Sequence, residues 1–459
     1  MMGKRAVISA AAAAAAIAAA AVLYMLHRSQ GQEAEDAGRK ETPVCLNNVL
    51  TDRMSDAPGL EKMDRKVERY MQYWHIRGAQ LAVMRHDSLL FCKGYGIADE
   101  IQCPHEGTEL RDTVAETFTV EMTPGHIMRV ASVSKLITAT GIMKLCEEGL
   151  LQLSDTVFGP HGILRNTLYS NAIRYTADYS KITVEHLLRH QAGFRRDPVF
   201  SANDVRRQMR LDSAPDLDDY SRLVLSKRLR YEPGGSQTYS NYGYMLLGRI
   251  IETVSGMGYE EYIQSHILRP AGCLDMHIAG NYYEDRRPNE TRYFVHEGDG
   301  KQIPEYNGSG RMVERCYGGN DIRLLGGAGA WVCSAAELAR FVASIDAVPQ
   351  PVPDVIGSES VGLMTEFTDS SKYSLGWNDT DPRKGWVRTG TLAGTNAMIK
   401  YFPDGECWIW LANTSTWKGP GHAKYTSILF DSLREKFSEK LPARNLFETA
   451  ESSSGNYPD

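Results

Sequence analysis

Strand-like sequence lies towards both ends of the chain, whereas its long middle part is mostly helix-like. Two strand-like runs at residues 79–84 and 89–96 surround a short polar turn and predict a hairpin. A second hairpin is predicted at residues 395–402 and 407–411, around a Pro-Asp-Gly-Glu turn. Helical spacing of apolar residues occurs in the segments 64–77, 134–149, 184–188, 202–211, 216–229, 242–254 and 423–437. The most economical fold joins both ends in one antiparallel sheet and inserts a helical lobe between them.

At 459 residues the chain is too long for one hydrophobic core, which supports two lobes. The predicted fold class is α+β: an α/β sandwich lobe whose antiparallel sheet comes from both chain ends, and an inserted all-helical lobe at roughly residues 136–330. The folded body is expected at residues 59–440, between a polar linker at 29–58 and a polar tail at 441–459. Residues 279–325 are rich in Gly, Asn and charge and predict a long loop region. A cleft at the lobe boundary is the default ligand site.

The N-terminal residues 1–28 have the pattern of a membrane signal. Lys4 and Arg5 precede an uncharged run at residues 6–26, which is long enough to cross a bilayer as a helix. Acidic residues follow the run, so the charge asymmetry favours a signal anchor with the body outside the cytoplasm. A cleaved signal peptide is the alternative, because alanine-rich sequence offers many small-residue cleavage sites. We therefore expect an exported body that is anchored to the membrane or, after cleavage, secreted.

Charge and cysteine content narrow the class of protein further. The formal net charge is −6, whereas a nucleic-acid partner would favour a basic stripe, so no nucleic acid is expected. Eight cysteines permit disulfides in an exported protein. Cys92 and Cys103 bracket a predicted strand and turn and are one candidate pair, whereas Cys146 and Cys333 lie where buried free thiols are common. No Cys-x-x-Cys spacing occurs, so the cysteines fit no zinc pattern.

Ser132 and Lys135 lie three residues apart, at the start of the helix-like segment 134–149. Positions i and i+3 share one face of a helix, so the lysine lies within hydrogen-bond reach of the serine hydroxyl. A serine hydroxyl is a poor nucleophile near neutral pH and needs an adjacent base. A lysine can serve when burial or nearby positive charge lowers its pKa. Alone, the pair is weak evidence, because most Ser-x-x-Lys pairs are a helix cap beside a solvated lysine.

Two later segments carry side chains that fit the same chemistry. A Gly-Pro loop before the helix-like segment 242–254 contains Tyr239 and Asn241, which alone would be core and cap residues. A strand-like segment at residues 386–394 has a small-residue step, and a small residue in a strand interior often lets a ligand or another backbone approach. The residues at this step are Arg388, Thr389, Gly390 and Thr391.

Taken in order, Ser-x-x-Lys, Tyr-x-Asn and a cation-Thr-Gly step resemble the serine β-lactamase and penicillin-binding protein superfamily. The resemblance is to the class C β-lactamase-like branch, which includes DD-carboxypeptidases, D-aminopeptidases and related esterases. It spans roughly residues 65–435 and implies a β-lactamase/transpeptidase-like fold. Three motifs in order over such a length are specific for this fold.

The resemblance implies a role for each matched residue. Ser132 would be the acylated nucleophile, and Lys135 would help to remove its hydroxyl proton. Tyr239 would relay protons to the leaving group and activate water, and Asn241 would hydrogen bond Lys135 or a substrate amide. The backbone N–H groups of Ser132 and Thr391 would form the oxyanion hole. Whether Lys135 or Tyr239 is the acylation base stays open, because such groups titrate as a coupled set.

The third motif departs from the family pattern, which usually begins with Lys or His. The residue here is Arg388, which keeps its charge and offers a planar fork suited to a carboxylate. A proton-relay role is therefore not expected at this position, whereas recognition of an acidic group such as a peptide C-terminus is. With Asn241, Thr389, Gly390 and Thr391, Arg388 makes up the expected substrate-binding set.

The resemblance predicts a serine hydrolase that acts through an acyl-enzyme on a small-molecule or peptide substrate. The bond could belong to a D-amino-acid peptide, another amide or an ester; a β-lactamase and a non-hydrolytic penicillin-binding sensor are the alternatives. The family match places His190 in a structural turn, and no Gly-x-Ser-x-Gly elbow supports a Ser-His-Asp triad. We expect neither a metal ion nor another cofactor.

Overall fold

The computed structural model describes residues 44–103, 116–174, 176–300, 302–369 and 372–448. Its largest sheet has the strand order β10-β11-β12-β1-β2-β3, and every neighbouring pair is antiparallel. The strands are β1 (Gly78–Arg85), β2 (Ser88–Cys103), β3 (Glu116–Glu121), β10 (Trp386–Leu392), β11 (Thr395–Tyr401) and β12 (Glu406–Ala412). The two chain ends meet where β1 pairs with β12, from Ala79 opposite Ala412 to Arg85 opposite Glu406. This pairing confirms the predicted sheet built from both ends.

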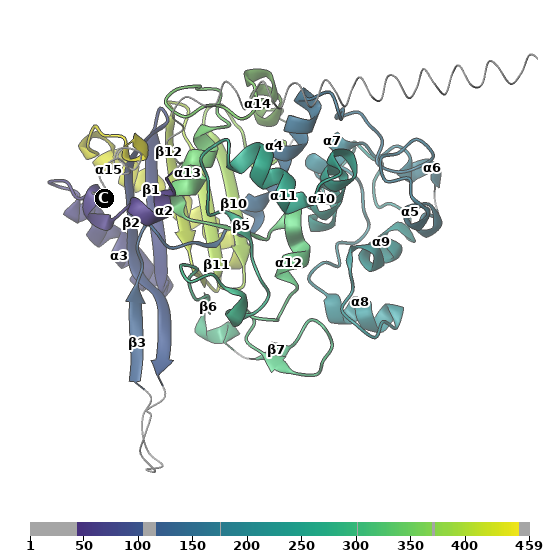
Figure 1. The fold of residues 1–459 in the computed structure, drawn as a ribbon, viewed down its shortest axis with the longest axis horizontal. Coiled ribbons are helices and arrows are strands. Elements are labelled where there is room, and N and C mark those ends of the chain that lie inside the picture. The colour runs from purple at the N-terminus through teal and green to yellow at the C-terminus, as the bar shows by residue number, and fades with distance from the viewer. Residues whose placement is uncertain (1–43, 104–115, 175, 301, 370–371, 449–459) are drawn as a thin grey trace, which may run out of the picture. The chain divides into compact units, whose positions relative to one another are not determined.

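The central strands are apolar on both faces because helices cover both sides of the sheet (Figure 1). Along β12, Trp408 and Trp410 pack with α3 (Glu61–Trp74) and α15 (Ala423–Phe437), whereas Ile409 and Leu411 belong to the core on the other face. On that second face, α13 (Ala335–Ala343) contacts β1, β2 and β12. Side chains alternate between the two faces of a strand, so a strand buried on both faces reads as an almost continuous apolar run.

The middle of the chain forms the predicted helical lobe. Its long helices are α4 (Ser134–Glu147) and α10 (Asn241–Ser255), which contact each other in the core. The shorter helices are α5 (Thr167–Ala172), α6 (Thr176–Tyr179), α7 (Val184–Leu188), α8 (Ala202–Met209), α9 (Leu217–Leu225), α11 (Tyr259–Ile263) and α12 (Ile322–Leu325). The helix-spaced segments therefore formed helices, with ends that moved by a few residues. The helix expected at 64–77 ends at Trp74, because His75 adopts a left-handed backbone conformation (φ 54°) as its C-cap.

The region 279–325 contains only short elements, as its composition predicts. Among its described residues they are β6 (Phe294–Val295), β7 (Ile303–Pro304), β8 (Met312–Val313) and α12, with the two short 3-10 segments η4 (Tyr283–Asp285) and η5 (Glu297–Asp299). A separate three-stranded sheet has the strand order β4-β9-β5. Its strands are β4 (Met128–Arg129), β9 (Trp331–Cys333) and β5 (His277–Ile278). The remaining elements are α2 (Leu46–Val49), β13 (Thr414–Ser415), which pairs with β6, and α14 (Ser358–Thr365).

Two segments expected to be polar linker and tail pack onto the body instead. In the region 44–58, Leu46 of α2 is fully buried and Leu50 is almost fully buried. Beyond residue 440, Leu446 and Phe447 are buried in the same core. A few apolar side chains among many polar ones suffice to dock each segment, because burying one leucine stabilises by about 2 kcal/mol.

The candidate disulfide between Cys92 and Cys103 is wrong. Both residues lie on the single long strand β2, where a rise of about 3.3 Å per residue places them roughly 30 Å or more apart. Cys92 and Cys333 are buried free thiols. Among the described residues, five further cysteines are also free. The apolar run 6–26 lies outside the described residues. Within the described ranges, no helix combines the length and apolar character that a membrane crossing requires.

Candidate active site

Ser132 lies in a 3-10 turn, η2 (Ala131–Val133), that joins β4 to α4 and is here called the serine turn. Ala131 has a left-handed backbone conformation (φ 49°), which bends the chain sharply before the serine. Such a conformation costs a non-glycine residue about 1 kcal/mol, and strain of this kind is common at functional sites. The hydroxyl of Tyr239 hydrogen bonds to Ser132 Oγ at 2.8 Å, and Lys135 Nζ donates to the same oxygen at 3.2 Å. Two titratable groups therefore converge on one serine hydroxyl.

Lys135 is completely buried in the first turn of α4. Besides Ser132, its ammonium group donates to Asn241 Oδ1 at 2.8 Å and to the carbonyl of Ala328 at 2.6 Å. These three acceptors match the three protons of an ammonium group. Burial lowers the pKa of Lys135 and outweighs the opposite pull of Tyr239, while the positive charge of Arg388 lowers it further. The lysine is thus fixed in place and easier to deprotonate than a solvated one.

Tyr239 has an unusually acidic phenol. Burial would raise its pKa, but the charges of Lys135 and Arg388, with hydrogen bonds from Lys135 and Ser132, lower the pKa to about 8. The Lys135 ammonium also lies over the phenol ring, 4.8 Å from its centroid. A phenolate is therefore accessible near neutral pH, at hydrogen-bond distance from the Ser132 hydroxyl.

Arg388 is fully buried in β10, and its position differs from the expected one. Its Nε donates to the carbonyl oxygen of Ser132 at 2.8 Å, and Nη2 donates to the same oxygen. Nη2 also lies 3.5 Å from the Tyr239 hydroxyl. One edge of the fork, which the sequence offers to a substrate carboxylate, is thus occupied by the protein's own backbone. Arg388 therefore holds the serine turn through its backbone carbonyl and places a permanent positive charge beside the Tyr239 phenol.

The small residue in β10 has a clear steric reason. A Cβ atom added at Gly390 would lie 2.1 Å from the carbonyl oxygen of Val130 and 3.0 Å from the Ser132 amide nitrogen. Glycine therefore lets β10 pass directly against the serine turn. Thr389 is held by Asn378, whose Oδ1 accepts from the Thr389 amide at 2.7 Å and from its hydroxyl at 3.1 Å. Sequence reasoning missed Asn378, because no motif marks it.

Thr391 follows within the same strand, opposite Asn396 of β11. Asn241, at the first position of α10, accepts a hydrogen bond from Lys135 through Oδ1, and its backbone N–H donates to Asp197. Asp197 lies four residues after Gly193 and was not singled out from the sequence. The predicted residues from three distant segments are therefore adjacent in space, at the boundary between the sheet and the helical lobe.

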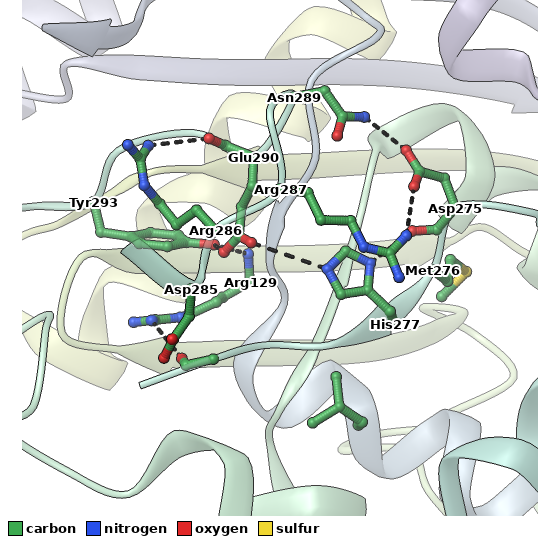
Figure 2. Close-up of polar contacts among 12 residues, drawn as sticks. Arg129, Asp275, Met276, His277, Asp285, Arg286, Arg287, Asn289, Glu290 and Tyr293 are labelled. Carbon is green, nitrogen blue, oxygen red and sulfur yellow. Dashed lines mark hydrogen bonds and ion pairs between the residues drawn. The ribbon is translucent and has the colours of Figure 1, made fainter. Parts of the chain in front are cut away.

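A buried polar cluster holds β4, the strand that leads into the serine turn (Figure 2). Arg129 of β4 donates to the carbonyl of Cys316 at 2.9 Å, and its guanidinium lies 4.2 Å from the Tyr293 ring centroid. The Tyr293 hydroxyl donates to Glu290 at 2.7 Å and accepts the Arg129 N–H at 2.9 Å. Burial raises the pKa of Glu290 and lowers that of His277, which faces it at 4.0 Å, to about 4. These contacts tie the loop region to the strand that leads to Ser132.

The fold and this constellation define a serine hydrolase of the β-lactamase type. A protein-family model described as Beta-lactamase matches residues 63–430, and the chain belongs to this family. Protein flp of Staphylococcus aureus strain MW2 is 28% identical over 212 residues, which are 46% of this chain and 36% of flp. A putative D-alanyl-D-alanine carboxypeptidase of Escherichia coli O157:H7 is 26% identical over 238 residues, 49% of each protein. The chain thus matches only about a third to a half of the length of these relatives.

Solved structures with low sequence identity share the fold. D-amino acid amidase from Ochrobactrum anthropi SV3, in complex with L-phenylalanine, superposes with a TM-score of 0.59 at 18% identity, covering 83% of this chain and 98% of that one. The octameric penicillin-binding protein homologue from Pyrococcus abyssi gives a TM-score of 0.55 at 22% identity, covering 82% and 78%. At these identities the likeness shows the β-lactamase/transpeptidase fold alone, which confirms the predicted fold class.

Proposed function

We propose that this protein hydrolyses small acyl substrates through an acyl-enzyme formed on Ser132. The observation that carries the proposal is the convergence of Tyr239 and Lys135 on Ser132 Oγ, at 2.8 Å and 3.2 Å. A serine hydroxyl becomes a competent nucleophile when a positioned base removes its proton, and both neighbours have lowered pKa values. A protein that only bound its ligand would have no need of this arrangement.

In the proposed first step, the Tyr239 phenolate takes the hydroxyl proton of Ser132 while Oγ attacks the substrate carbonyl carbon. Lys135 stays charged, since its three hydrogen-bond acceptors favour the ammonium form, and its charge stabilises the phenolate. The negative charge on the carbonyl oxygen would be held by the backbone N–H groups of Ser132 and Thr391. Each such donor contributes about 3 kcal/mol to a transition state of this kind.

In the second step, Tyr239 would return its proton to the leaving group, and the bond between the carbonyl carbon and that group breaks. The phenolate then takes a proton from water as the water oxygen attacks the acyl carbon. Tyr239 returns this proton to Ser132 Oγ at 2.8 Å as the bond between the acyl carbon and Oγ breaks, which releases the acid and restores the Ser132 hydroxyl. The same group acts as acid and as base in alternate steps, which suits a phenol whose pKa lies near the working pH.

The proposed substrates are peptides, amides or esters of small acyl groups, such as D-amino-acid peptides. Support comes from the family, and from the D-amino acid amidase and the putative D-alanyl-D-alanine carboxypeptidase among the similar proteins. A β-lactamase forms the same acyl-enzyme and differs in the acyl group it releases quickly. A penicillin-binding sensor would stop after the first step.

We also propose that the body is held outside the cytoplasm by residues 6–26. The support is the uncharged run that follows Lys4-Arg5 and precedes the acidic residues Glu33, Glu35 and Asp36. Membranes from cells that express the full chain with a C-terminal tag test this proposal. Recovery in the alkali-washed membrane at full mass supports an anchor, and a mass reduced at the N-terminus indicates cleavage. Full-mass protein in the soluble fraction would contradict both.

The acyl-enzyme is tested by labelling the protein with a fluorophosphonate and with a fluorescent penicillin, followed by intact mass over time. We expect one adduct on Ser132, none with Ser132→Ala, and slower labelling with Tyr239→Phe. Tyr242→Phe is the matched control, because its hydroxyl bonds to Ser221 in the helical lobe, away from the serine. Penicillin label that decays indicates turnover, and persistent label favours the sensor. Equal labelling of wild type and Ser132→Ala would refute the assignment.

A further inference from the structure

Tyr239 stands on a part of the chain that has no regular structure of its own. Residues 231–240 form turns and bends, and a helix begins only at Asn241. A phenol on such a segment needs contacts from elsewhere to stay within 2.8 Å of Ser132 Oγ. Misplacement of a catalytic group by about 1 Å can lower a rate by about 100-fold. The contacts that hold Tyr239 in place therefore affect the rate of the proposed reaction.

His190, one residue beyond the C-cap of α7, accepts hydrogen bonds from the backbone on both sides of Tyr239. Its carbonyl oxygen accepts the Thr238 N–H at 2.8 Å, and its ring nitrogen Nδ1 accepts the Ser240 N–H at 3.1 Å. The two residues that flank Tyr239 are thus both bonded to the same histidine. Gln237 adds a third contact, since its side chain donates to the carbonyl of Arg189 at 3.0 Å.

The imidazole ring also covers the phenol ring itself. The two ring centroids lie 4.4 Å apart in a tilted arrangement, with an interplanar angle of 34°. Tyr373 meets both rings, at 4.9 Å from His190 and 5.6 Å from Tyr239. Lys135 lies 4.8 Å from the phenol centroid. These contacts restrict the rotation of the ring, while its hydroxyl stays directed at Ser132.

The backbone of His190 has a conformation that is uncommon for a residue with a side chain. Its φ is 58°, the left-handed conformation in which a helix usually ends with glycine or asparagine. Glycine would relieve the strain but remove the ring and the Nδ1 acceptor. Strained residues persist where function requires their side chains, and His190 is 2% exposed and in contact with the catalytic phenol.

The ring has to be neutral to do this. Nδ1 accepts a hydrogen bond, which places the ring proton on Nε2, and burial together with the charges of Lys135 and Arg388 keeps the pKa of His190 well below 6.5. The other titratable groups in contact with the ring are Tyr239, Tyr244 and Tyr373, from α10 and the segments before and after it. A third positive charge here would repel both cations and leave the Ser240 N–H without its acceptor.

We propose that His190 is a positioning residue for Tyr239: through its carbonyl, its Nδ1 and its ring, it holds the phenol against Ser132 and between the two cations. This inference rests on the proposed function of Tyr239. His190 itself transfers no proton and touches no reacting atom. Its loss should therefore act on the rate of acylation and on the acidity of the phenol, and not on substrate affinity.

The test uses His190→Asn, which keeps an acceptor and tolerates the left-handed backbone but has no ring, and His190→Phe, which keeps a ring but has no acceptor. Second-order labelling with the fluorophosphonate is measured from pH 6 to about 10 in the full chain. We expect rates about 10- to 100-fold lower and a pH inflection above the wild-type value near 8. His75→Asn is the matched control, because exposed His75 has φ 54° at the end of α3.

A double-mutant comparison separates positioning from general support of the fold. If His190 acts through Tyr239, His190→Asn should change the labelling rate by less than about twofold when Tyr239 is already Phe. An equal loss in both backgrounds, or wild-type rates and inflection in both His190 variants, would overturn the proposal.

A spectroscopic titration covers variants that label poorly and does not depend on activity. The tyrosinate absorbance of Tyr239, taken as the difference from Tyr239→Phe, should titrate near pH 8 in wild type and about one unit or more higher in the His190 variants. An unchanged titration refutes the inference. Labelling of Ser132→Ala at the wild-type rate would instead refute the proposed function and leave this result standing.

Discussion

Replacing Arg388 by methionine should make the phenol of Tyr239 a weaker acid. The variant keeps a long side chain in the buried position and removes the charge that lies 3.5 Å from the phenol oxygen. At an effective dielectric constant of about 20, two unit charges at this distance interact by about 5 kcal/mol, or about 3.5 pKa units. Opposite charges in proteins typically shift a pKa by about 1–3 units. We therefore expect the pKa of Tyr239 to rise from about 8 by about 1–3 units.

The direction of the pH effect follows from the proposed base. The phenolate is the active form, so acylation rises with pH through the pKa of Tyr239. In Arg388→Met this limb should move to higher pH, and labelling at pH 8 should fall about tenfold or more while that near pH 10 recovers in part. The assay is the labelling rate against pH, with the tyrosinate titration as an independent reading.

Arg388→Lys separates the charge from the hydrogen bonds. It keeps a positive charge near Tyr239 but loses the fork that Nε and Nη2 form on the Ser132 carbonyl. Its inflection should stay within about one unit of wild type, whereas both variants should lose about 1–3 kcal/mol of unfolding free energy, because the carbonyl loses its partners. An inflection near pH 8 in Arg388→Met would refute the view that this charge sets the acidity of the phenol.

Three further substitutions test other parts of the structure. Asp87→Asn should stabilise the fold at pH 8 but not at pH 4. Burial and the nearby carboxylates raise the pKa of Asp87 to about 9, so the free energy of unfolding of the wild type falls as the pH rises above 3.8. Thermal unfolding of both proteins at the two pH values measures the difference. Gly390→Ala places a Cβ 2.1 Å from the Val130 carbonyl and should slow labelling by about 100-fold, whereas Gly362→Ala, with open space around it, should not. Asn241→Leu removes the 2.8 Å acceptor of Lys135; labelling should fall by about 10-fold or more, and an unchanged rate would mean that this hydrogen bond is not needed for acylation.

Local pattern was enough to predict the elements where the chain has one dominant period. The closing helix at 423–437 and the short α7 at 184–188 agree residue by residue with the apolar spacing. Both hairpins were predicted from their turn residues, and the sheet followed because an inserted helical lobe leaves the two ends as the only partners for each other. The segments 44–58 and 441–448 were mistaken for linker and tail, since a few apolar residues in a polar context give no periodic signal.

The serine-lysine pair and Tyr239 were predicted from short motifs, whereas the partners of Arg388 were not. Spacing along the chain brings Lys135 to Ser132, because both lie within one helical turn. Nothing in the order of residues shows that a guanidinium 256 positions away meets the Ser132 carbonyl. That contact exists because Gly390 lets β10 approach the serine turn, and a backbone contact of this kind appears only in the folded chain.

The charge balance of the site explains why an arginine can replace the usual lysine or histidine here. Lys135 and Arg388 are both fully buried, and within the described residues neither forms an ion pair with a carboxylate. A buried charge is costly unless a partner of opposite sign compensates it. The phenolate of Tyr239 can provide this opposite charge, because Tyr239 lies between the two cations. Their charges lower the pKa of Tyr239 to about 8. Arginine cannot give up its proton, so the positive charge on this side of the phenol is permanent, and in the proposed mechanism Tyr239 alone exchanges a proton with Ser132.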